Sequence, residues 1–370
     1  MISYSRFHTG CSWLVTAIFF GALSVVPASA DVKYNVTDLG TLGGTFSTPI
    51  GINASGQVVG YSYIADGAQH AFLYNGSAMA DLGTLGGTNS EACGINDSGL
   101  AVGRAWNASG NRRAFVSNGS AMSDLGTLGG TYSEAYGIND SGEVVGMAST
   151  AYGAEHAFLY NGTTMTDLGT LGGGQGYAYG VNASGQVVGA ASTATSGGHR
   201  HAFFYNGTTM ADLGTFGGTD SYAQGINGSG QVVGWAATAG GAQHAFLYNG
   251  SVMADLGALG GTNSYAYGIN ASGQVVGYAE TTPGGNDHAF LFSGSTMVDL
   301  NSLIDSSSGW QLFEANAIND AGQIAGTAYN STTGEDHAVL LSPVPEPSTF
   351  ALLGVAFAGI IVVARRRRSR

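Results

Sequence analysis

Cysteine and charge are scarce in this chain of 370 residues. One cysteine, Cys11, lies in an apolar N-terminal segment, and the other, Cys93, stands alone in the rest of the chain. A chain that loses the N-terminal segment therefore cannot form an intramolecular disulfide. Only 9% of the residues are charged. Sustained helical periodicity of apolar residues is confined to the two termini, which points away from a helical fold between them.

Basic residues are especially few: eleven Lys and Arg stand against 24 acidic residues, for a net charge of −13. Six of the eleven are Arg6 and five arginines between positions 365 and 370. Without those six positive charges, the net charge of −13 becomes −19 for the rest of the chain. Such a surface repels a phosphate backbone, which argues against nucleic-acid binding. An acidic surface also attracts divalent cations, although a role in solubility is enough to explain the negative charge.

Glycine is abundant, with 62 residues, and much of it belongs to a repeat. The triplet DLG, or DLN in the last copy, begins at Asp38, Asp81, Asp124, Asp167, Asp212, Asp255 and Asp299. GIN or a close variant begins at Gly51, Gly94, Gly137, Gly180, Gly225, Gly268 and Ala317. HAF or a variant begins at His70, Arg113, His156, His201, His244, His288 and His337. Three markers that recur in one order about every 43 residues identify a repeat protein.

Residues 136–168 show the content of one repeat. It contains four short β-type segments, which we name by their sequences: the GIN, VVG, HAF and DLG strands. Turn residues separate the first two strands, and Asn161-Gly162, a strong hairpin signal, separates the last two. Four antiparallel strands in about 43 residues are typical of a β-propeller blade. A β-solenoid is the alternative, although its coils are usually shorter and lack tight hairpins.

The two ends of the repeat region favour the propeller. The region opens with residues 34–39, a DLG strand without a HAF partner, and closes with residues 337–341, a HAF strand without a DLG partner. Joining these strands completes a seventh blade and removes the exposed sheet edges. We therefore predict that residues 31–342 form an all-β, seven-bladed β-propeller of four-stranded blades, with the N-terminal strand closing the last blade.

The repeated histidines suggest a metal or catalytic site, but their spacing favours architecture. If Asn161-Gly162 is a two-residue loop, His156 lies directly opposite Asp167. The same rule predicts the pairs His70–Asp81, Arg113–Asp124, His201–Asp212, His244–Asp255, His288–Asp299 and, across the closure, His337–Asp38. A catalytic or metal site needs different residues that converge at one place, whereas here one pair is copied around a ring. We predict no catalytic, metal or cofactor site.

Recognition is expected at one end of the propeller. The VVG–HAF loops vary from copy to copy and share that end with the DLG–GIN crossovers, while near-identical tight turns share the other end. Variable loops on a rigid scaffold commonly carry binding. The aromatic residues on or near these loops are Tyr61, Tyr63, Trp106, Tyr152 and Trp235, and they suit stacking on sugar rings. Packing between blades is the alternative for each of them.

An enzyme is a further alternative. A propeller hydrolase or lyase needs carboxylates at the central channel, and the candidates are Glu91, Glu134 and Glu314, just before GIN strands. The near-identical repeats offer no distinctive acid pair. Hydrolase triads, zinc-type Cys/His spacings, EF-hand loops and phosphate-cradling loops are also missing from the sequence. We therefore expect no enzymatic activity.

The N-terminus has the pattern of a secretory signal peptide over residues 1–30. Arg6 and His8 precede an apolar run at residues 13–26, and Ala28-Ser29-Ala30 matches the small-residue cleavage pattern. Cleavage between Ala30 and Asp31 would make Asp31 the new N-terminus. A retained membrane anchor is the alternative, but the apolar run is short for one.

The C-terminus, residues 343–370, combines a short motif, an apolar segment and a basic end. Pro345, Glu346 and Pro347 precede fifteen largely apolar residues at positions 350–364, and RRRRSR follows. This order resembles the PEP-CTERM sorting signal of Gram-negative bacteria. The resemblance implies a transient inner-membrane anchor, processing by an exosortase, and an exopolysaccharide-producing host. A plain single-pass anchor is the alternative, and it also places residues 31–342 outside the cytoplasm.

The repeats themselves resemble a known family. HAFLYNG, DLGTLGG and GINxSGQVVG, across residues 34–341, are similar to the HAF family of extracellular repeat proteins. Departures are Arg113-Ala-Phe, His337-Ala-Val and Asp299-Leu-Asn, and the family brings no catalytic residues to carry over. We predict a secreted or surface-associated protein with a structural or recognition role in the extracellular matrix or envelope. The alternatives are a carbohydrate-binding propeller and a propeller hydrolase or lyase.

Overall fold

The computed structural model describes residues 33–194 and 198–344. These residues are almost entirely β-structure, and one short 3-10 helix, η1 (Leu300–Leu303), interrupts the strands. The predicted signal peptide with its Ala30–Asp31 cleavage site, and the Pro345-Glu346-Pro347 motif with the apolar segment after it, lie outside the described residues. Within the described ranges, no helix has the length and apolar character needed to span a membrane.

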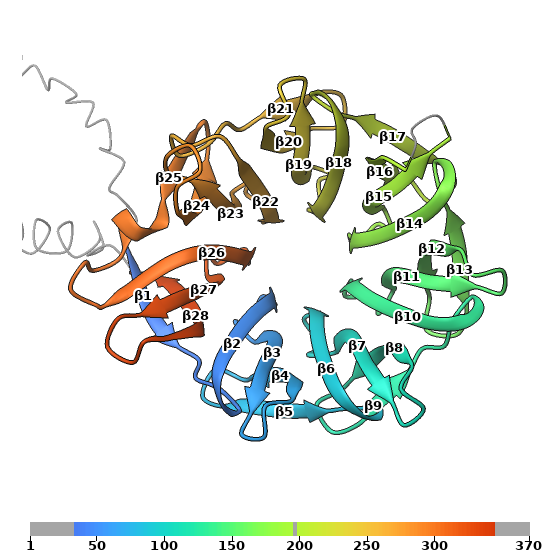
Figure 1. The fold of residues 1–370 in the computed structure, drawn as a ribbon, viewed down its shortest axis with the longest axis horizontal. Helices are drawn as coiled ribbons and strands as arrows, with labels where there is room; N and C mark the ends of the chain where they lie inside the picture. Colours follow the sequence, from blue (N-terminus) through green and yellow to red (C-terminus); the bar gives the residue numbers. More distant parts are fainter. Residues whose placement is uncertain (1–32, 195–197, 345–370) are drawn as a thin grey trace, which may run out of the picture. The chain divides into compact units, whose positions relative to one another are not determined.

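Each repeat contributes four strands that pair in antiparallel order, as in a propeller blade (Figure 1). The GIN strands are innermost: β2 (Gly43–Ile52), β6 (Gly86–Ile95), β10 (Gly129–Ile138), β14 (Gly172–Val181), β18 (Gly217–Ile226), β22 (Ser264–Ile269) and β26 (Trp310–Ile318). The VVG strands follow: β3 (Val58–Ile64), β7 (Ala101–Asn107), β11 (Val144–Thr150), β15 (Val187–Thr193), β19 (Val232–Thr238), β23 (Val275–Glu280) and β27 (Ile324–Asn330).

The two outer strands of each sheet complete the unit. The HAF strands are β4 (Gln69–Tyr74), β8 (Arg112–Ser117), β12 (Glu155–Tyr160), β16 (Arg200–Tyr205), β20 (Gln243–Tyr248), β24 (Asp287–Ser293) and β28 (Glu335–Pro343). The DLG strands are β1 (Tyr34–Asp38), β5 (Met79–Gly83), β9 (Met122–Asp124), β13 (Met165–Gly169), β17 (Met210–Gly214), β21 (Met253–Asp255) and β25 (Thr296–Asp299). A single parallel pairing of β2 with β28, and another of β12 with β14, join neighbouring units at two places.

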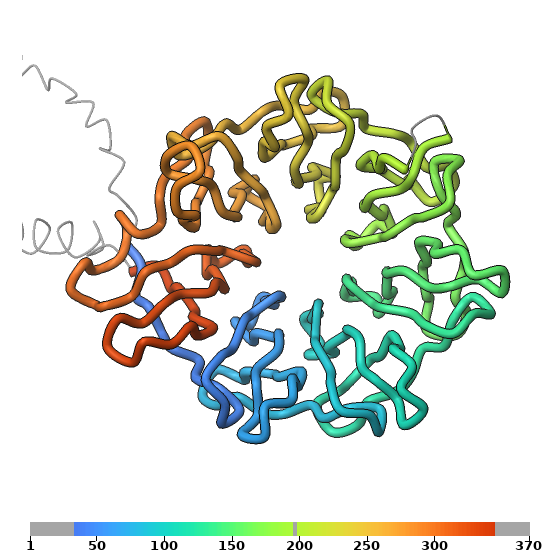
Figure 2. The backbone as a smooth tube through the Cα atoms, viewed as in Figure 1, coloured from blue at the N-terminus to red at the C-terminus, as the bar shows by residue number. Residues whose placement is uncertain are grey.

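The first strand of the described chain lies against the last one. β1 pairs with β28 in antiparallel register, with Tyr34 opposite Pro343 and Asp38 opposite Val339. The innermost strands contact one another in chain order, and β26 also contacts β2 (Figure 2). The unit that contains β26, β27 and β28 therefore takes its fourth strand from the other end of the repeat region.

The same hydrogen bond to an asparagine side chain shapes each turn between the GIN and VVG strands. In the turn after β10, the Asn139 side-chain Oδ1 accepts the backbone N–H of Glu143 at 2.9 Å. Gly142 donates its N–H to the Asn139 carbonyl at 3.0 Å and has φ of +80°, a conformation that glycine adopts without steric cost. Asn and Gly at these positions therefore specify a tight reversal between two strands.

The HAF–DLG hairpin differs from the two-residue loop that its Asn-Gly pair predicts. Tyr160 pairs with Met165, so four residues form the loop. Asn161 Oδ1 accepts the backbone N–H groups of Thr163 at 3.1 Å and Thr164 at 2.9 Å. The asparagine side chain thus stabilises a longer turn than the Asn-Gly rule assumes, and the predicted strand register was wrong by two residues.

Hydrophobic clusters join each unit to the next. Phe158 of the third HAF motif is fully buried and packs in one cluster with Val102 and Ala114 of the preceding unit. The VVG glycines permit this close packing: a Cβ on Gly146 would overlap the Glu134 carbonyl oxygen of the neighbouring strand. These glycines and buried phenylalanines therefore have a structural role in the repeat.

Two of the three departures from the repeat motifs, His337-Ala-Val and Asp299-Leu-Asn, contribute to one buried cluster. Val339 replaces the HAF phenylalanine in the last unit, and the DLN variant at Asp299 leads into η1. Leu300 and Leu303 of η1 pack in the same buried cluster as Val339 and Leu312. We infer that these leucines fill the volume that a phenylalanine occupies in the other units.

Candidate functional site

The repeated histidines contact the aspartates with which the sequence analysis pairs them. The Nδ1–carboxylate distances are 2.8 Å for His70–Asp81, His156–Asp167 and His201–Asp212, 2.7 Å for His244–Asp255 and His288–Asp299, and 3.0 Å for His337–Asp38. The predicted geometry was nevertheless wrong, because Asp167 lies directly opposite Phe158 rather than His156. His156 reaches Asp167 along the diagonal of the ladder, a separation that long side chains can span.

Each aspartate also stabilises the backbone. Asp81 Oδ1 accepts the N–H of Gly83 at 2.7 Å, while its Oδ2 contacts His70. In the second unit Arg113 replaces histidine, and its Nε lies 3.9 Å from Asp124, too far for a hydrogen bond. No group of three or more His, Cys, Asp or Glu side chains suited to a metal ion occurs within residues 33–194 and 198–344. The geometry of these pairs is that of a repeated structural contact.

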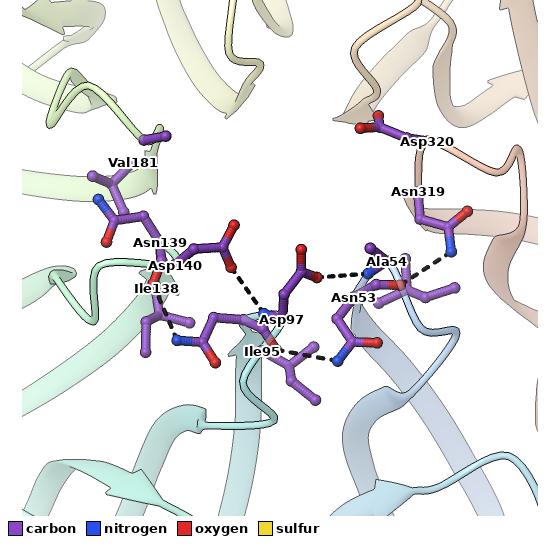
Figure 3. Close-up of a pocket in the computed structure, with 13 residues that line it drawn as sticks. Asn53, Ala54, Ile95, Asp97, Ile138, Asn139, Asp140, Val181, Asn319 and Asp320 are labelled. Carbon is purple, nitrogen blue, oxygen red and sulfur yellow. Dashed lines mark hydrogen bonds between the residues drawn. The ribbon is translucent and has the colours of Figure 1, made fainter.

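The GIN–VVG turns surround a cavity of about 240 Å³ (Figure 3). Here the Asn53 side-chain Nδ2 donates to the Asn96 carbonyl at 3.1 Å, and Asn96 donates in the same way to Asn139 at 3.2 Å. The corresponding donors further along are Asn139, Asn182, Asn227, Asn270 and Asn319, and the last donates to Asn53. We call this series the asparagine circuit, and we call the end of the molecule that carries it the turn end.

Carboxylates at the turn end are also bound by the backbone. Asp97 Oδ1 accepts the N–H of Ala54 at 2.8 Å, and Asp140 Oδ1 accepts the N–H of Asp97 at 2.9 Å (Figure 3). Asp320 contacts Ala271 N–H in the same way at 2.8 Å. These contacts make the turn end a link between units, as its near-identical sequences predict.

A second cavity, of about 430 Å³, lies further towards the DLG–GIN crossovers, at what we call the loop end. Arg104 lies at its wall and binds two of the three predicted glutamates. Its Nη2 lies 2.8 Å from Glu91 Oε2, and its Nη1 lies 2.5 Å from Glu134 Oε2. Arg112 contacts the other oxygen of Glu134 at 2.6 Å. Both carboxylates are therefore neutralised by arginines.

The third glutamate, Glu314, lines the same cavity without an arginine partner. Burial raises the pKa of its carboxyl group, although hydrogen bonds from Asn316 and Tyr267 oppose the shift. Burial also raises the pKa of the Tyr179 and Tyr267 hydroxyls, so both stay protonated and can donate hydrogen bonds. The cavity wall thus presents the protonated hydroxyls of Tyr179 and Tyr267 beside the ion pairs that Arg104 forms with the two other glutamates.

Cys93 lies on the same wall, where other units carry tyrosines. Its Sγ is 3.9 Å from Glu91 Oε1, and burial raises the pKa of its thiol well above the usual value. A thiol held in the protonated form is a poor nucleophile. This placement agrees with a packing role for Cys93.

The five predicted ligand-face aromatics lie at separate places. Tyr152 is 99% exposed at the tip of a VVG–HAF loop, and Tyr63 is 38% exposed with its ring 5.7 Å from that of Phe46. The three others contact neighbouring side chains: Tyr61 lies 5.9 Å from Phe46, Trp106 lies 5.8 Å from the Arg112 guanidinium, and Trp235 lies 4.5 Å from Tyr222. Each of these three contacts joins neighbouring strands of one unit. Packing between blades, the alternative stated for these aromatics, describes Trp235, whose ring also lies 5.6 Å from that of Tyr265 in the next unit.

The side chains that differ between units gather at the loop end. The residue after each VVG is Tyr61, Arg104, Met147, Ala190, Trp235, Tyr278 or Thr327, and its cross-strand partner is Thr48, Glu91, Glu134, Tyr177, Tyr222, Tyr265 or Glu314. The residue directly after each cross-strand partner, by contrast, is alanine in every unit but the first, where it is Pro49. No motif marks Arg104, Tyr222 or the cavity tyrosines as site residues. The signal that distinguishes them is the variation at equivalent positions when the repeats are aligned with one another.

Two parts of the chain match known family models. Residues 343–368 match the PEP-CTERM protein-sorting motif, which confirms the sorting signal predicted from Pro345-Glu346-Pro347 and the residues after it. Residues 171–259 and 256–344 match a model described as a protein of unknown function, DUF3466. That model differs from the HAF family, so the resemblance to HAF repeats stays a prediction. A search of the curated proteins finds no match to this chain.

A solved structure with a similar fold is a β-propeller. The β-propeller domain of the Trilobed protease from Pyrococcus furiosus, described as having an open velcro topology, aligns with a TM-score of 0.51 and 8% identity, over 80% of this chain and 93% of that one. YCF48 bound to D1 peptide aligns with a TM-score of 0.46 and 13% identity, over 85% and 97%. The six-bladed lectin of Aleuria aurantia gives 0.36 and 11%, over 86% and 99%. The first of these likenesses supports a propeller fold and carries nothing about activity.

Proposed function

We propose that residues 31–342 form a closed, seven-bladed propeller between a signal peptide, residues 1–30, and a sorting signal, residues 343–370. The pairing of β1 with β28 supports closure, because it supplies the last unit with its DLG strand. The hydrogen bond from Asn319 to Asn53 supports it independently at the opposite end of the innermost strands. A propeller closed at both places has no free sheet edge at its seam.

The PEP-CTERM motif points to an exported protein that is processed by an exosortase. We propose that the apolar segment after the motif holds the protein briefly in the inner membrane before this processing. Mass spectrometry of the mature protein tests the step, since processing removes the terminal RRRRSR. An exported protein with an intact arginine tail would show that the segment is a permanent anchor.

We propose that the exported protein is a recognition module of the extracellular matrix or envelope, and that its binding surface is the loop end. The observation that carries this proposal is the gathering of the repeat-variable side chains there, around the 430 Å³ cavity, on units that are otherwise nearly identical. A purely structural ring has no need of different residues at equivalent positions. Variable residues on a repeated scaffold are the usual arrangement of a binding surface.

Binding is favoured over catalysis by the state of the glutamates. Glu91 and Glu134 share the partner Arg104, and each is held in an ion pair with it. A general acid and a nucleophile need carboxyl groups with separate, tuned environments, which a shared arginine does not provide. We therefore propose that this protein is not a glycosidase or a lyase.

The proposed ligand is extracellular polysaccharide of the host. The test is co-sedimentation of the exported protein with exopolysaccharide purified from the same strain. We expect wild type to bind the polysaccharide saturably. The loop-end variant Tyr267→Ala should bind it more weakly than wild type, and the turn-end variant Asp140→Ala should bind it as wild type does. Equal recovery of the protein with and without the polysaccharide would contradict the proposal.

A further inference from the structure

A separate pocket of about 530 Å³ lies over β18 and β19 at the loop end. Its lining includes Tyr222 and Trp235, which are direct cross-strand partners with ring centroids 4.5 Å apart and planes at 19°. Tyr265 of the next unit contacts Trp235 edge-on at 5.6 Å. The pocket volume is within the range of about 300–1,000 Å³ found for small-molecule sites.

A small residue opens this pocket. The third residue after VVG is Ala237 in this unit, whereas it is Tyr63, Trp106, Glu280 or Tyr329 in four others. Ala237 lines the pocket, and Gly218 lies so close that a Cβ on it would be 2.6 Å from the Ala237 Cβ. Gly87 lies against Trp106 in the same way, so the backbone accommodates a large side chain at this position. In the unit of Ala237, this volume is left to solvent or a ligand.

Polar groups on the pocket wall can form further hydrogen bonds with the hydroxyl groups of a ligand. Asp220 accepts the Arg200 N–H at 3.0 Å and the Thr219 hydroxyl at 2.8 Å, and its Oδ2 lies 3.2 Å from His199 Nδ1. A carboxylate has about four acceptor positions, so one remains for a further donor. Gln243 Oε1 accepts the Tyr265 hydroxyl, which directs the Gln243 amide as a donor.

The charge of the pocket selects against acidic ligands. Although partial burial opposes the shift, hydrogen bonds from Arg200 and Thr219 and the contact with His199 lower the pKa of Asp220, so its carboxyl group is ionised at neutral pH. The nearby Arg200 guanidinium is directed to other groups, Tyr222 Oη at 3.2 Å and Gln175 Oε1 at 2.5 Å. The chain as a whole is also strongly acidic, with a net charge of −13.

We propose that this pocket is a binding site for a neutral sugar residue of a polysaccharide chain, with the sugar ring against Trp235 and Tyr222 and its hydroxyl groups bonded to Asp220 and Gln243. Aromatic rings contact the apolar C–H face of a sugar, while a carboxylate and an amide accept and donate to its hydroxyls. This inference rests on the proposed recognition function and names its ligand class and site.

The test uses the exported protein and three neutral hexasaccharides, a β-glucan, a mannan and a galactan, with an alginate hexamer as the acidic comparison. Calorimetry and the tryptophan fluorescence change are the measurements. We expect at least one neutral hexasaccharide to bind and the alginate hexamer to bind at least tenfold more weakly. Ala237→Trp, which introduces the side chain that the second unit carries at this position as Trp106, should weaken neutral-sugar binding at least tenfold, and Trp235→Ala should do the same.

The matched control is Ser192→Trp, which places the same side chain at the equivalent position of another unit. It should retain binding, and the melting temperatures of all variants show whether each is folded. Preference for alginate, or neutral-sugar binding that folded Ala237→Trp and Trp235→Ala proteins keep, would overturn the inference. Host polysaccharide bound equally by wild type and Ala237→Trp would overturn this site while the recognition function stands. Absence of binding to the host polysaccharide and to every hexasaccharide would overturn both.

Discussion

The side chain of Asn319 donates a hydrogen bond of 3.0 Å to the backbone carbonyl of Asn53, 266 residues earlier in the chain. Every other link of the asparagine circuit joins consecutive units, whereas this one joins the last unit to the first. Asn319 is 6% exposed, so its amide has little access to water as an alternative partner. The contact is therefore a local measure of whether the proposed propeller is closed.

Replacing Asn319 with alanine should destabilise the protein. The change removes the bond to Asn53 and two bonds to Gln323, at 2.9 Å and 3.0 Å, and leaves the Asn53 carbonyl without this donor. With roughly 1 kcal/mol for each hydrogen bond, we expect a loss of about 3 kcal/mol in the free energy of unfolding. Urea denaturation measures it, with Asn35→Ala, an exposed asparagine of β1, as the control. Equal stability of the two variants would contradict closure at the turn end.

Closure by β1 has its own test. Leu39 is 5% exposed, follows β1, and packs in a cluster with Phe72 and Leu340. Leu39→Ala should cost about 2–4 kcal/mol, as for other buried leucines, and deletion of residues 31–40 should lower the melting temperature further. Thr37→Ala, at an exposed position of the same strand, serves as the control. Unchanged thermal melting of both Leu39→Ala and the deletion variant would rule out a structural role for β1.

The repeat period predicted the four-stranded units, and the unpaired markers at the two ends predicted the pairing of β1 with β28. Both follow from the sequence because they depend on local patterns and on counting. The hairpin register does not follow from it. The Asn-Gly rule assumes a two-residue loop, but the Asn161 side chain accepts two backbone N–H groups beyond Gly162 and extends the turn to four residues.

The loop-end clusters depend on packing between units, which a single repeat does not encode. Arg104 lies on β7 but binds Glu134 of β10, and Trp235 of β19 contacts Tyr265 of β22. These partners are 30 residues apart in both cases, in different copies of the repeat. No motif within one repeat predicts such contacts, because the residues at these positions differ in each copy and form a shared surface only when the units lie side by side.

The two members of a His–Asp pair should differ in their contribution to stability. His70→Ala removes only the side-chain contact to Asp81, an exposed interaction worth less than about 1 kcal/mol. Asp81→Ala removes that contact and the bond to Gly83 N–H, so we expect a cost of about 1–2 kcal/mol. A double-mutant cycle by chemical denaturation separates the terms. A larger effect for His70→Ala than for Asp81→Ala would show that the pair has a role beyond architecture.

Removing Arg104 should have a far larger effect than removing another arginine. Glu134 is 3% exposed and Glu91 is 11% exposed, so Arg104→Met leaves buried negative charge without this partner and should cost about 3–5 kcal/mol. Adding Glu91→Gln to Arg104→Met should restore part of that loss, while Glu134 keeps its contact with Arg112.

The matched control for Arg104 is Arg113→Met. Arg113 lies 3.9 Å from Asp124, which is 39% exposed, and its removal should cost less than about 1 kcal/mol. Thermal and urea denaturation of the four proteins, each at the same ionic strength, measures the difference. Similar losses for Arg104→Met and Arg113→Met would show that the glutamates at the loop end are solvated, which would also remove the argument against their use in catalysis.

Glu314 should make the stability of the protein depend on pH. Burial raises the pKa of its carboxyl group in the folded protein above the ordinary value of 4.5. The folded state therefore holds this proton more tightly than the unfolded state, and stability is lost as the pH rises through the raised pKa. Glu314→Gln removes the ionisation while it keeps a polar group beside Tyr267 and Asn316. We expect the variant to melt above wild type at pH 7, and the difference to shrink as the pH falls to 4.5.

Glu280→Gln provides a comparison of opposite sign, because a hydrogen bond from Asn263 lowers the pKa of this exposed carboxyl group. Its stabilising contribution is present at neutral pH and is lost as the pH falls through the lowered pKa. Melting curves of wild type and the two variants between pH 4 and pH 8 measure these shifts. A difference in melting temperature between Glu314→Gln and wild type that does not change with pH would show that Glu314 is fully solvated in the loop-end cavity.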